Sequence, residues 1–228
     1  MTTLNKSKIE LLAPAGKLEN AYAAIENGAD ALYVGGKLFN ARQYANNFTN
    51  EMLQELVKYC KLRGVKVYIT LNILIKQDEV IEVFNYLDYL SSLSIDGIII
   101  QDVGVARIVK EYFPHIPLHA STQMTIHSIN DVKFIEEYGF SRVVLARELT
   151  LKDIAQISKT SEIELETFVH GALCYSFSGQ CLLSSFIGGR SGNRGQCAQP
   201  CRMGYSLFEN KKKVVSNKCL LSLKIGRA

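Results

Sequence analysis

Seven short apolar runs alternate with segments of helical periodicity along this 228-residue chain, and this alternation restricts the folds open to it. The apolar runs cover residues 9–14, 31–34, 65–71, 97–101, 118–121, 142–146 and 163–169, and the helical segments cover residues 18–27, 50–63, 78–92, 103–112, 128–138 and 150–158. Such strands and helices predict a parallel sheet covered by helices. An open doubly wound sheet usually has a glycine-rich phosphate turn after its first strand, which Ala13-Pro14-Ala15-Gly16 does not match. The pattern therefore favours an α/β fold of the (β/α)8 TIM-barrel type.

The C-terminal part departs from the alternation. Apolar runs at 205–208 and 214–216 flank a polar turn and predict a hairpin, and a last apolar run begins at Cys219 with no eighth helix after it. We therefore expect residues 1–173 to form the βα repeats of a TIM-like barrel. Residues 174–228 are expected to add a cysteine-rich cluster-binding segment, the hairpin and a last strand to the same domain, which is truncated so that the barrel stays incomplete at the C-terminus.

Four of the six cysteines, Cys174, Cys181, Cys197 and Cys201, follow one another with the spacing C-x6-C-x15-C-x3-C. The N-terminus has no apolar leader and no run approaches about eighteen apolar residues, so we expect a cytoplasmic protein without a membrane partner. In that reducing compartment, metal binding or thiol chemistry is a better explanation than disulfides. Four thiolates suit a 4Fe-4S cluster or a structural zinc ion, and the wide first pair favours the cluster while leaving zinc and free thiols open. The remaining cysteines, Cys60 and Cys219, are expected to be buried small apolar residues.

Polar side chains follow most of the predicted strands. In a barrel the loops after the strands build the active face, so these residues are candidates for chemistry, although each also suits a helix cap or a solvated loop, as Asp102 and Thr150 do best. The candidate catalytic residues are His119, Gln123, Glu148, Glu166 and His170, and the candidate substrate-binding residues are Asn40, Arg42, Asn72, Arg147 and Arg194. Histidine can move protons near neutral pH, and arginine can bind a carboxylate or phosphate or hold a loop through backbone carbonyls.

The segment Glu166-Thr-Phe-Val-His-Gly-Ala-Leu-Cys-Tyr-Ser-Phe-Ser-Gly-Gln-Cys-Leu-Leu-Ser184 fits the pattern E-x-F-x2-G-[SA]-[LIVM]-C-x4-G-x-C-x-[LIVM]-S at every specified position. Together with Glu10-Leu-Leu-Ala-Pro-Ala-Gly and Asn193-Arg-Gly-Gln-Cys-Ala-Gln-Pro-Cys-Arg, it resembles the collagenase-like peptidase family U32 over about residues 9–205. The resemblance implies either a proteolytic activity or hydroxylation of a tRNA or rRNA base with prephenate as the hydroxyl source; relatives also hydroxylate ubiquinone precursors. It also implies a 4Fe-4S cluster on the four cysteines.

Three functions follow from this resemblance and the residues. The first is an Fe-S-dependent enzyme that supports hydroxylation of tRNA or rRNA and takes a small anionic donor; the net charge of +4 supports an RNA partner only slightly. The second is a peptidase acting on a peptide substrate, in which Glu166, His170 and Cys174 align if their segment is helical. The third is an inactive metal-binding remnant, because family members continue beyond Leu220-Leu-Ser-Leu-Lys-Ile-Gly-Arg-Ala with a glutamate that this chain lacks.

Overall fold

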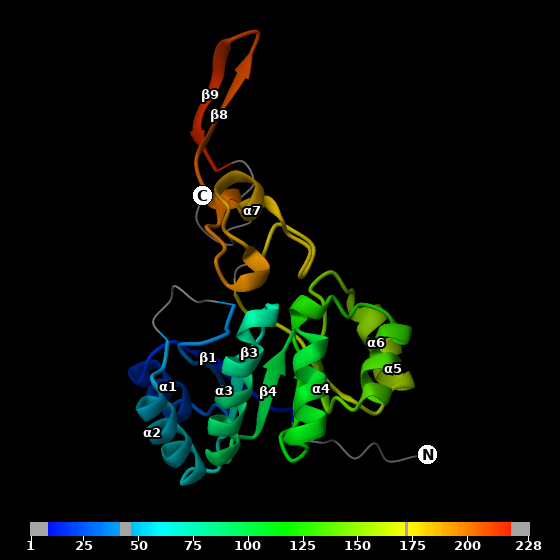
Figure 1. The fold of residues 1–228 in the computed structure, drawn as a ribbon. Helices are drawn as coiled ribbons and strands as arrows, with labels where there is room; N and C mark the ends of the chain where they lie inside the picture. Colours follow the sequence, from blue (N-terminus) through cyan, green and yellow to red (C-terminus); the bar gives the residue numbers. More distant parts are fainter. Residues whose placement is uncertain (1–8, 42–46, 172, 220–228) are drawn as a thin grey trace.

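A computed structural model describes residues 9–41, 47–171 and 173–219 of the chain. Seven strands form one parallel sheet in which each strand pairs with the next along the sequence, and the sheet curls with helices on its outside (Figure 1). The strands are β1 (Leu12–Ala15), β2 (Ala31–Gly35), β3 (Lys66–Leu71), β4 (Gly97–Ile100), β5 (Leu118–Ala120), β6 (Arg142–Val144) and β7 (Glu164–Glu166). The predicted TIM-barrel-like α/β fold is thus confirmed, with seven strands in the parallel sheet that the described residues form.

Six helices connect or follow these strands close to the predicted positions. They are α1 (Leu18–Glu26), α2 (Asn50–Lys61), α3 (Val80–Ser92), α4 (Val103–Tyr112), α5 (Ile129–Tyr138) and α6 (Leu151–Thr160). Each presents an apolar stripe to the sheet: Leu53 and Leu56 of α2 and Leu87 of α3 are fully buried, as are Ile69 and Ile98 on the strands. The main core therefore lies between the sheet and its helices.

Side chains fix where several of these helices begin. The hydroxyls of Thr49 and Thr150 and the carboxylate of Asp102 accept hydrogen bonds from backbone N–H groups in the first turns of α2, α6 and α4. Asp102 also accepts one from the N–H of Ile75, at 3.0 Å, which ties the loop after β3 to the end of β4. The capping roles expected for Asp102 and Thr150 are therefore confirmed.

The cysteine-rich segment lies over the carboxyl ends of the strands, and the hairpin projects from it away from the sheet (Figure 1). The segment contains α7 (Leu183–Gly188) and the 3-10 turns η3 (Gly192–Arg194) and η4 (Pro200–Arg202). The predicted hairpin is confirmed as β8 (Tyr205–Glu209) and β9 (Lys212–Lys218), whereas α7 had no clear signal in the sequence. The last predicted strand lies almost wholly outside the described residues. In the described part of the chain, no helix has the length and apolar character needed to cross a bilayer.

Candidate functional site

An open cavity of about 740 Å³ lies between the strand ends and the cysteine-rich segment. All four predicted metal ligands line it: Cys174, Cys181, Cys197 and Cys201. Gln123, in the 3-10 turn η2 (Thr122–Met124) after β5, and Arg147, after β6, line it from the sheet side. Arg190 and Arg202 line it from the cysteine-rich segment. The fold thus brings together thiols and guanidinium groups from positions far apart in the sequence, at the end of the sheet where barrel active sites lie.

Ser178 anchors the first cysteine loop to the sheet. It is fully buried, its backbone N–H donates to a carboxylate oxygen of Glu148 at 3.0 Å, and its hydroxyl accepts from Nε of Arg147 at 3.0 Å. Gly179 follows with φ +73°, and a Cβ at that position would lie 2.2 Å from the carbonyl oxygen of Gln123. Glu148, which was predicted to be catalytic, therefore holds the first cysteine loop in place.

A second anchor fixes the other cysteine loop. Arg194 donates two hydrogen bonds to the carboxylate of Glu79, at 2.9 and 2.5 Å, and a third to the carbonyl oxygen of Leu74 at 2.6 Å. These bonds join η3 to η1 (Gln77–Glu79), so Arg194, predicted to bind substrate or to hold a loop, holds a loop here. At Gly195, φ is +74° and a Cβ would lie 2.2 Å from the carbonyl oxygen of Asn40, so only glycine fits there.

Asn40 and Asn72, two predicted substrate-binding residues, form hydrogen bonds in the loop that contacts Gly195. Asn40 is buried and its amide donates to the carbonyl oxygen of Gly36 at 2.5 Å. The side-chain oxygen of Asn72 accepts from the N–H of Ala41 at 2.9 Å. These bonds shape the loop after β2 that receives Gly195. Arg42 lies outside the described residues.

Three of the thiols act electrostatically on the fourth, Cys201. Burial raises the pKa of Cys201, and the neighbouring Cys174, Cys197 and Cys181 raise it further. All six cysteines are free of disulfide bonds. Cys60 is buried as predicted, whereas Cys219 is exposed, so the prediction that Cys219 is buried was wrong. Within residues 9–41, 47–171 and 173–219, no three His, Cys, Asp or Glu side chains come close enough to hold a single metal ion.

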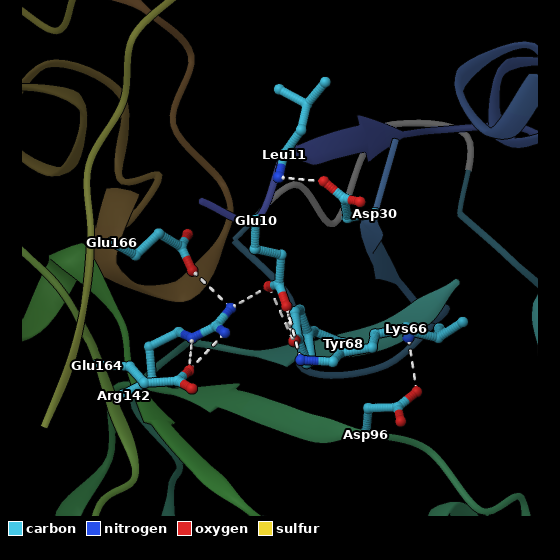
Figure 2. Close-up of polar contacts among 10 residues, drawn as sticks. Glu10, Leu11, Asp30, Lys66, Tyr68, Asp96, Arg142, Glu164 and Glu166 are labelled. Carbon is cyan, nitrogen blue, oxygen red and sulfur yellow. Dashed lines mark hydrogen bonds and ion pairs between the residues drawn. The ribbon is translucent and has the colours of Figure 1, made fainter. Parts of the chain in front are cut away.

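Of the remaining predicted residues, Glu166 belongs to a partly buried ionic network near the amino ends of the strands, centred on Arg142 (Figure 2). Arg142, the first residue of β6, donates to Glu10 at 2.7 Å and, through two nitrogens, to Glu164 at 2.8 and 2.5 Å. Its guanidinium also lies 3.6 Å from Glu166 and over the ring of Tyr68. We call Glu10, Tyr68, Arg142, Glu164 and Glu166, with Lys66 bound to Glu10 at 2.7 Å, the Arg142 network.

Burial sets the charge of the groups in and beside this network. Burial alone would raise the pKa of Glu10, but hydrogen bonds from Arg142 and Lys66 lower it to about 2. Burial raises the pKa of Glu166 to about 7, although Arg142 opposes the rise. Burial lowers the pKa of His119 to about 3, and its ring packs against that of Tyr68 with centroids 4.6 Å apart. His119 therefore stays neutral at physiological pH and is absent from the cysteine cavity, so its position does not support proton transfer there.

The segment from Glu166 to Cys174 does not form the helix that a Glu-His-Cys alignment requires. β7 ends at Glu166, the described residues between it and Cys174 have no helical structure, and Gly171 has φ +126°. His170 is exposed and Glu166 points to Arg142 rather than to the cavity. The helical alignment on which the peptidase hypothesis depended is therefore wrong.

Sequence reasoning missed Ser178, Glu79 and Arg142. Ser178 lies between Cys174 and Cys181, and this position between two predicted ligands was the one signal in the sequence that could have pointed to it. Arg142 bonds Glu10 across 132 positions and Arg194 bonds Glu79 across 115, and no local pattern reports such a pairing.

Comparison with known proteins decides the family. The family model described as Peptidase family U32 matches residues 16–226. The chain belongs to Peptidase family U32. This U32 chain is 41% identical over 223 residues to the 23S rRNA 5-hydroxycytidine C2501 synthase of Escherichia coli, a match that covers 97% of this chain and 34% of the relative. It is 39% identical over 202 residues to the tRNA hydroxylation protein P1 of Bacillus subtilis, covering 89% of this chain and 48% of the relative.

Other relatives in the family are named as proteases. The chain is 35% identical over 216 residues to the collagenase of Porphyromonas gingivalis, a match that covers 90% of this chain and 51% of that protein. The solved structure of a U32 peptidase has the same fold, with a TM-score of 0.63 at 15% identity over 75% of this chain and 73% of that one. The U32 chain thus spans about a third to a half of the length of these curated relatives.

Proposed function

We propose that this chain is the barrel and cysteine-bearing part of an enzyme that hydroxylates a base of tRNA or rRNA in the cytoplasm. The observation that carries the proposal is the cavity at the strand ends onto which four cysteines and Arg147 converge. The RNA-modifying relatives at 39–41% identity supply the substrate class. A barrel uses this end of its sheet for chemistry, so the cavity is where the base and a donor would meet.

The cysteines suit a 4Fe-4S cluster better than a zinc ion. Four thiolates on one zinc ion at about 2.3 Å would stand within about 4 Å of one another, whereas cluster ligands bind different irons and stand farther apart. In the described part of the chain the thiols surround one cavity without three of them coming close enough for a single ion. Once bound, the cluster would supply electron transfer to this cavity.

Arg147 is the residue that we assign to a small anionic donor, a prephenate-like dicarboxylate. The guanidinium lines the cavity, and its orientation is fixed because Nε and the backbone N–H both bond the hydroxyl of Ser178. A planar guanidinium held in this way matches a carboxylate, and it faces the donor from the sheet side. Gln123, in the neighbouring turn, offers an amide to either the donor or the base.

The test is hydroxylation of RNA by the full chain. Purified protein is incubated with the donor, a reductant and RNA from cells that lack the corresponding modification, and hydroxylated pyrimidine nucleosides are measured by mass spectrometry. We expect product with the wild-type chain, at least a tenfold loss with Arg147→Gln, and no change with Arg107→Gln, whose side chain is exposed on α4. Release of peptides from gelatin by a metal-free chain, without nucleoside product, would overturn the proposal in favour of a peptidase. If neither hydroxylation nor peptide release is observed, the result also overturns the proposal and favours the inactive-remnant hypothesis.

A further inference from the structure

The hairpin of β8 and β9 stands apart from the sheet and has no core beneath it. It forms a separate two-stranded antiparallel sheet and projects from the cysteine-rich segment (Figure 1). Its apolar side chains are exposed: Leu207 by 52%, Phe208 by 60% and Val214 by 47%. A lone two-stranded hairpin is marginal in water, so an exposed hairpin with apolar side chains on it is suited to binding a partner.

The charge of the hairpin indicates the chemistry of that partner. Residues 205–218 contain four lysines and one glutamate, a net charge of +3, in a chain whose total is +4. Lys211, Lys212 and Lys213 are consecutive and exposed at the turn. Lys213 lies directly opposite Phe208 in the strand register, so an aromatic ring and a cation share one face. Phosphates with unstacked bases are the ligand that such a face fits.

The base of the hairpin is fixed to the cysteine loop. The hydroxyl of Tyr205 donates to the carbonyl oxygen of Pro200 at 2.8 Å, one residue before Cys201. A Cβ on Gly204 would lie 2.0 Å from the side chain of Asn217, so the two strands meet closely at this base. A partner held on the hairpin is therefore held in a fixed relation to the cavity that Cys201 lines.

We propose that the β8–β9 hairpin is a binding arm for single-stranded RNA, with Lys211, Lys212 and Lys213 on phosphates and Phe208 stacked on a base. This inference rests on the proposed function, because it assigns the RNA to a surface of the same site. From the hairpin, the RNA would continue toward the cavity, near which Phe177 is about half exposed. Phe177 lines the cavity, so its ring can stack on a base that enters it.

Binding of a fluorescein-labelled single-stranded RNA of about 15 nucleotides to the full chain tests the arm. We expect the Lys211→Ala, Lys212→Ala, Lys213→Ala variant to bind at least tenfold more weakly and to reduce the slope of log K against log salt by about 2, as for three lost phosphate contacts. The matched control is Lys58→Ala, Lys61→Ala, Lys152→Ala, which removes the same charge from exposed positions on α2 and α6. Equal losses in the two triple variants would overturn the proposal, because they would show a dependence on net charge alone.

Substitutions at Phe208 test stacking. Phe208→Leu is expected to weaken binding about fivefold or more and Phe208→Tyr to leave it nearly unchanged, because stacking needs an aromatic ring. If Phe208→Leu changes only the oligomeric state in sedimentation, the hairpin binds protein and the proposal fails. Nucleoside hydroxylation is measured separately: hairpin-dependent RNA binding without product would remove the proposed function and leave the arm, whereas product with unchanged binding in the hairpin variants would do the reverse.

Discussion

The two ends of the sheet hold their charges in opposite ways. Near the amino ends of the strands, Arg142 is buried and contacts three carboxylates, so one cation is shared by several acidic groups (Figure 2). At the carboxyl ends, Arg194 with Glu79 and Ser178 with Glu148 fix the loops at their edges, and the thiols between them face an open cavity. The comparison separates polar residues that stabilise the fold from those that prepare a site, although both groups looked alike in the sequence.

Removing the arginine at the centre of the Arg142 network tests whether these polar residues stabilise the fold, and it should have the largest effect. Arg142→Ala leaves Glu10, Glu164 and Glu166 close together without their shared cation, so we expect the free energy of unfolding to fall by about 3–5 kcal/mol. Urea denaturation measures it, and Arg107→Ala on the exposed face of α4 is the control, expected to cost less than about 0.5 kcal/mol. A loss below about 1 kcal/mol would show that the network does not stabilise the barrel.

Gly179→Ala tests the contact between the first cysteine loop and the carboxyl ends of the strands. The added Cβ meets the carbonyl oxygen of Gln123 and φ is +73°, so we expect a loss of about 2–3 kcal/mol, or displacement of the first cysteine loop with loss of bound iron. Gly188→Ala is the control, since a Cβ there meets nothing within 4 Å and its φ is ordinary. Thermal melts and iron content of both variants distinguish the outcomes, and equal behaviour would contradict the tight docking at Gly179.

Glu166→Gln tests the charge balance of the network through pH. The pKa of Glu166 is about 7 in the folded chain and about 4.5 when unfolded, so the folded state holds this proton more tightly. The resulting stability is fully present below about pH 4.5 and is lost as the pH rises to about 7. The glutamine of the variant does not titrate. Between pH 5 and 8 the free energy of unfolding of the variant should therefore rise by about 2 kcal/mol relative to that of the wild type.

Stability curves in urea at both pH values measure that difference. Glu137→Gln, exposed on α5, is the control and should leave the pH profile of the wild type unchanged. A constant difference between Glu166→Gln and the wild type across this range would show that Glu166 is not desolvated in the folded chain.

The smallest expected effect is that of Arg194→Gln. The ion pair with Glu79 is about a fifth exposed on both sides, so solvent screens it and we expect a loss of about 1 kcal/mol. Because Arg194 holds a loop, RNA hydroxylation per bound cluster should change little, in contrast to Arg147→Gln. A specific loss of donor binding in Arg194→Gln, measured by the KM for the donor, would return this residue to the substrate site.

The sequence predicts the sheet well because its signals are local. Apolar runs bounded by Gly28 or Gly64, and caps such as Asp102, mark each strand and helix within a few residues. The cysteine spacing likewise identified four of the residues that line the cavity. The partners of Arg142 and Arg194 were not predictable, because each pair forms only when distant elements pack together. His119 illustrates the same limit: its place inside the barrel follows from which face of β5 turns inward, which three residues of strand do not reveal.

The metal content of the chain tests the central claim most directly. Protein purified without oxygen is analysed for visible absorbance, iron, sulfide and zinc, beside a Cys174→Ser, Cys181→Ser variant and a Cys219→Ser control at an exposed cysteine outside the cavity. We predict a brown protein with about four irons and four sulfides per chain, retained in Cys219→Ser and lost in the double variant. A colourless protein without iron, or one zinc ion bound by the same cysteines, would contradict the assignment of a cluster to this cavity.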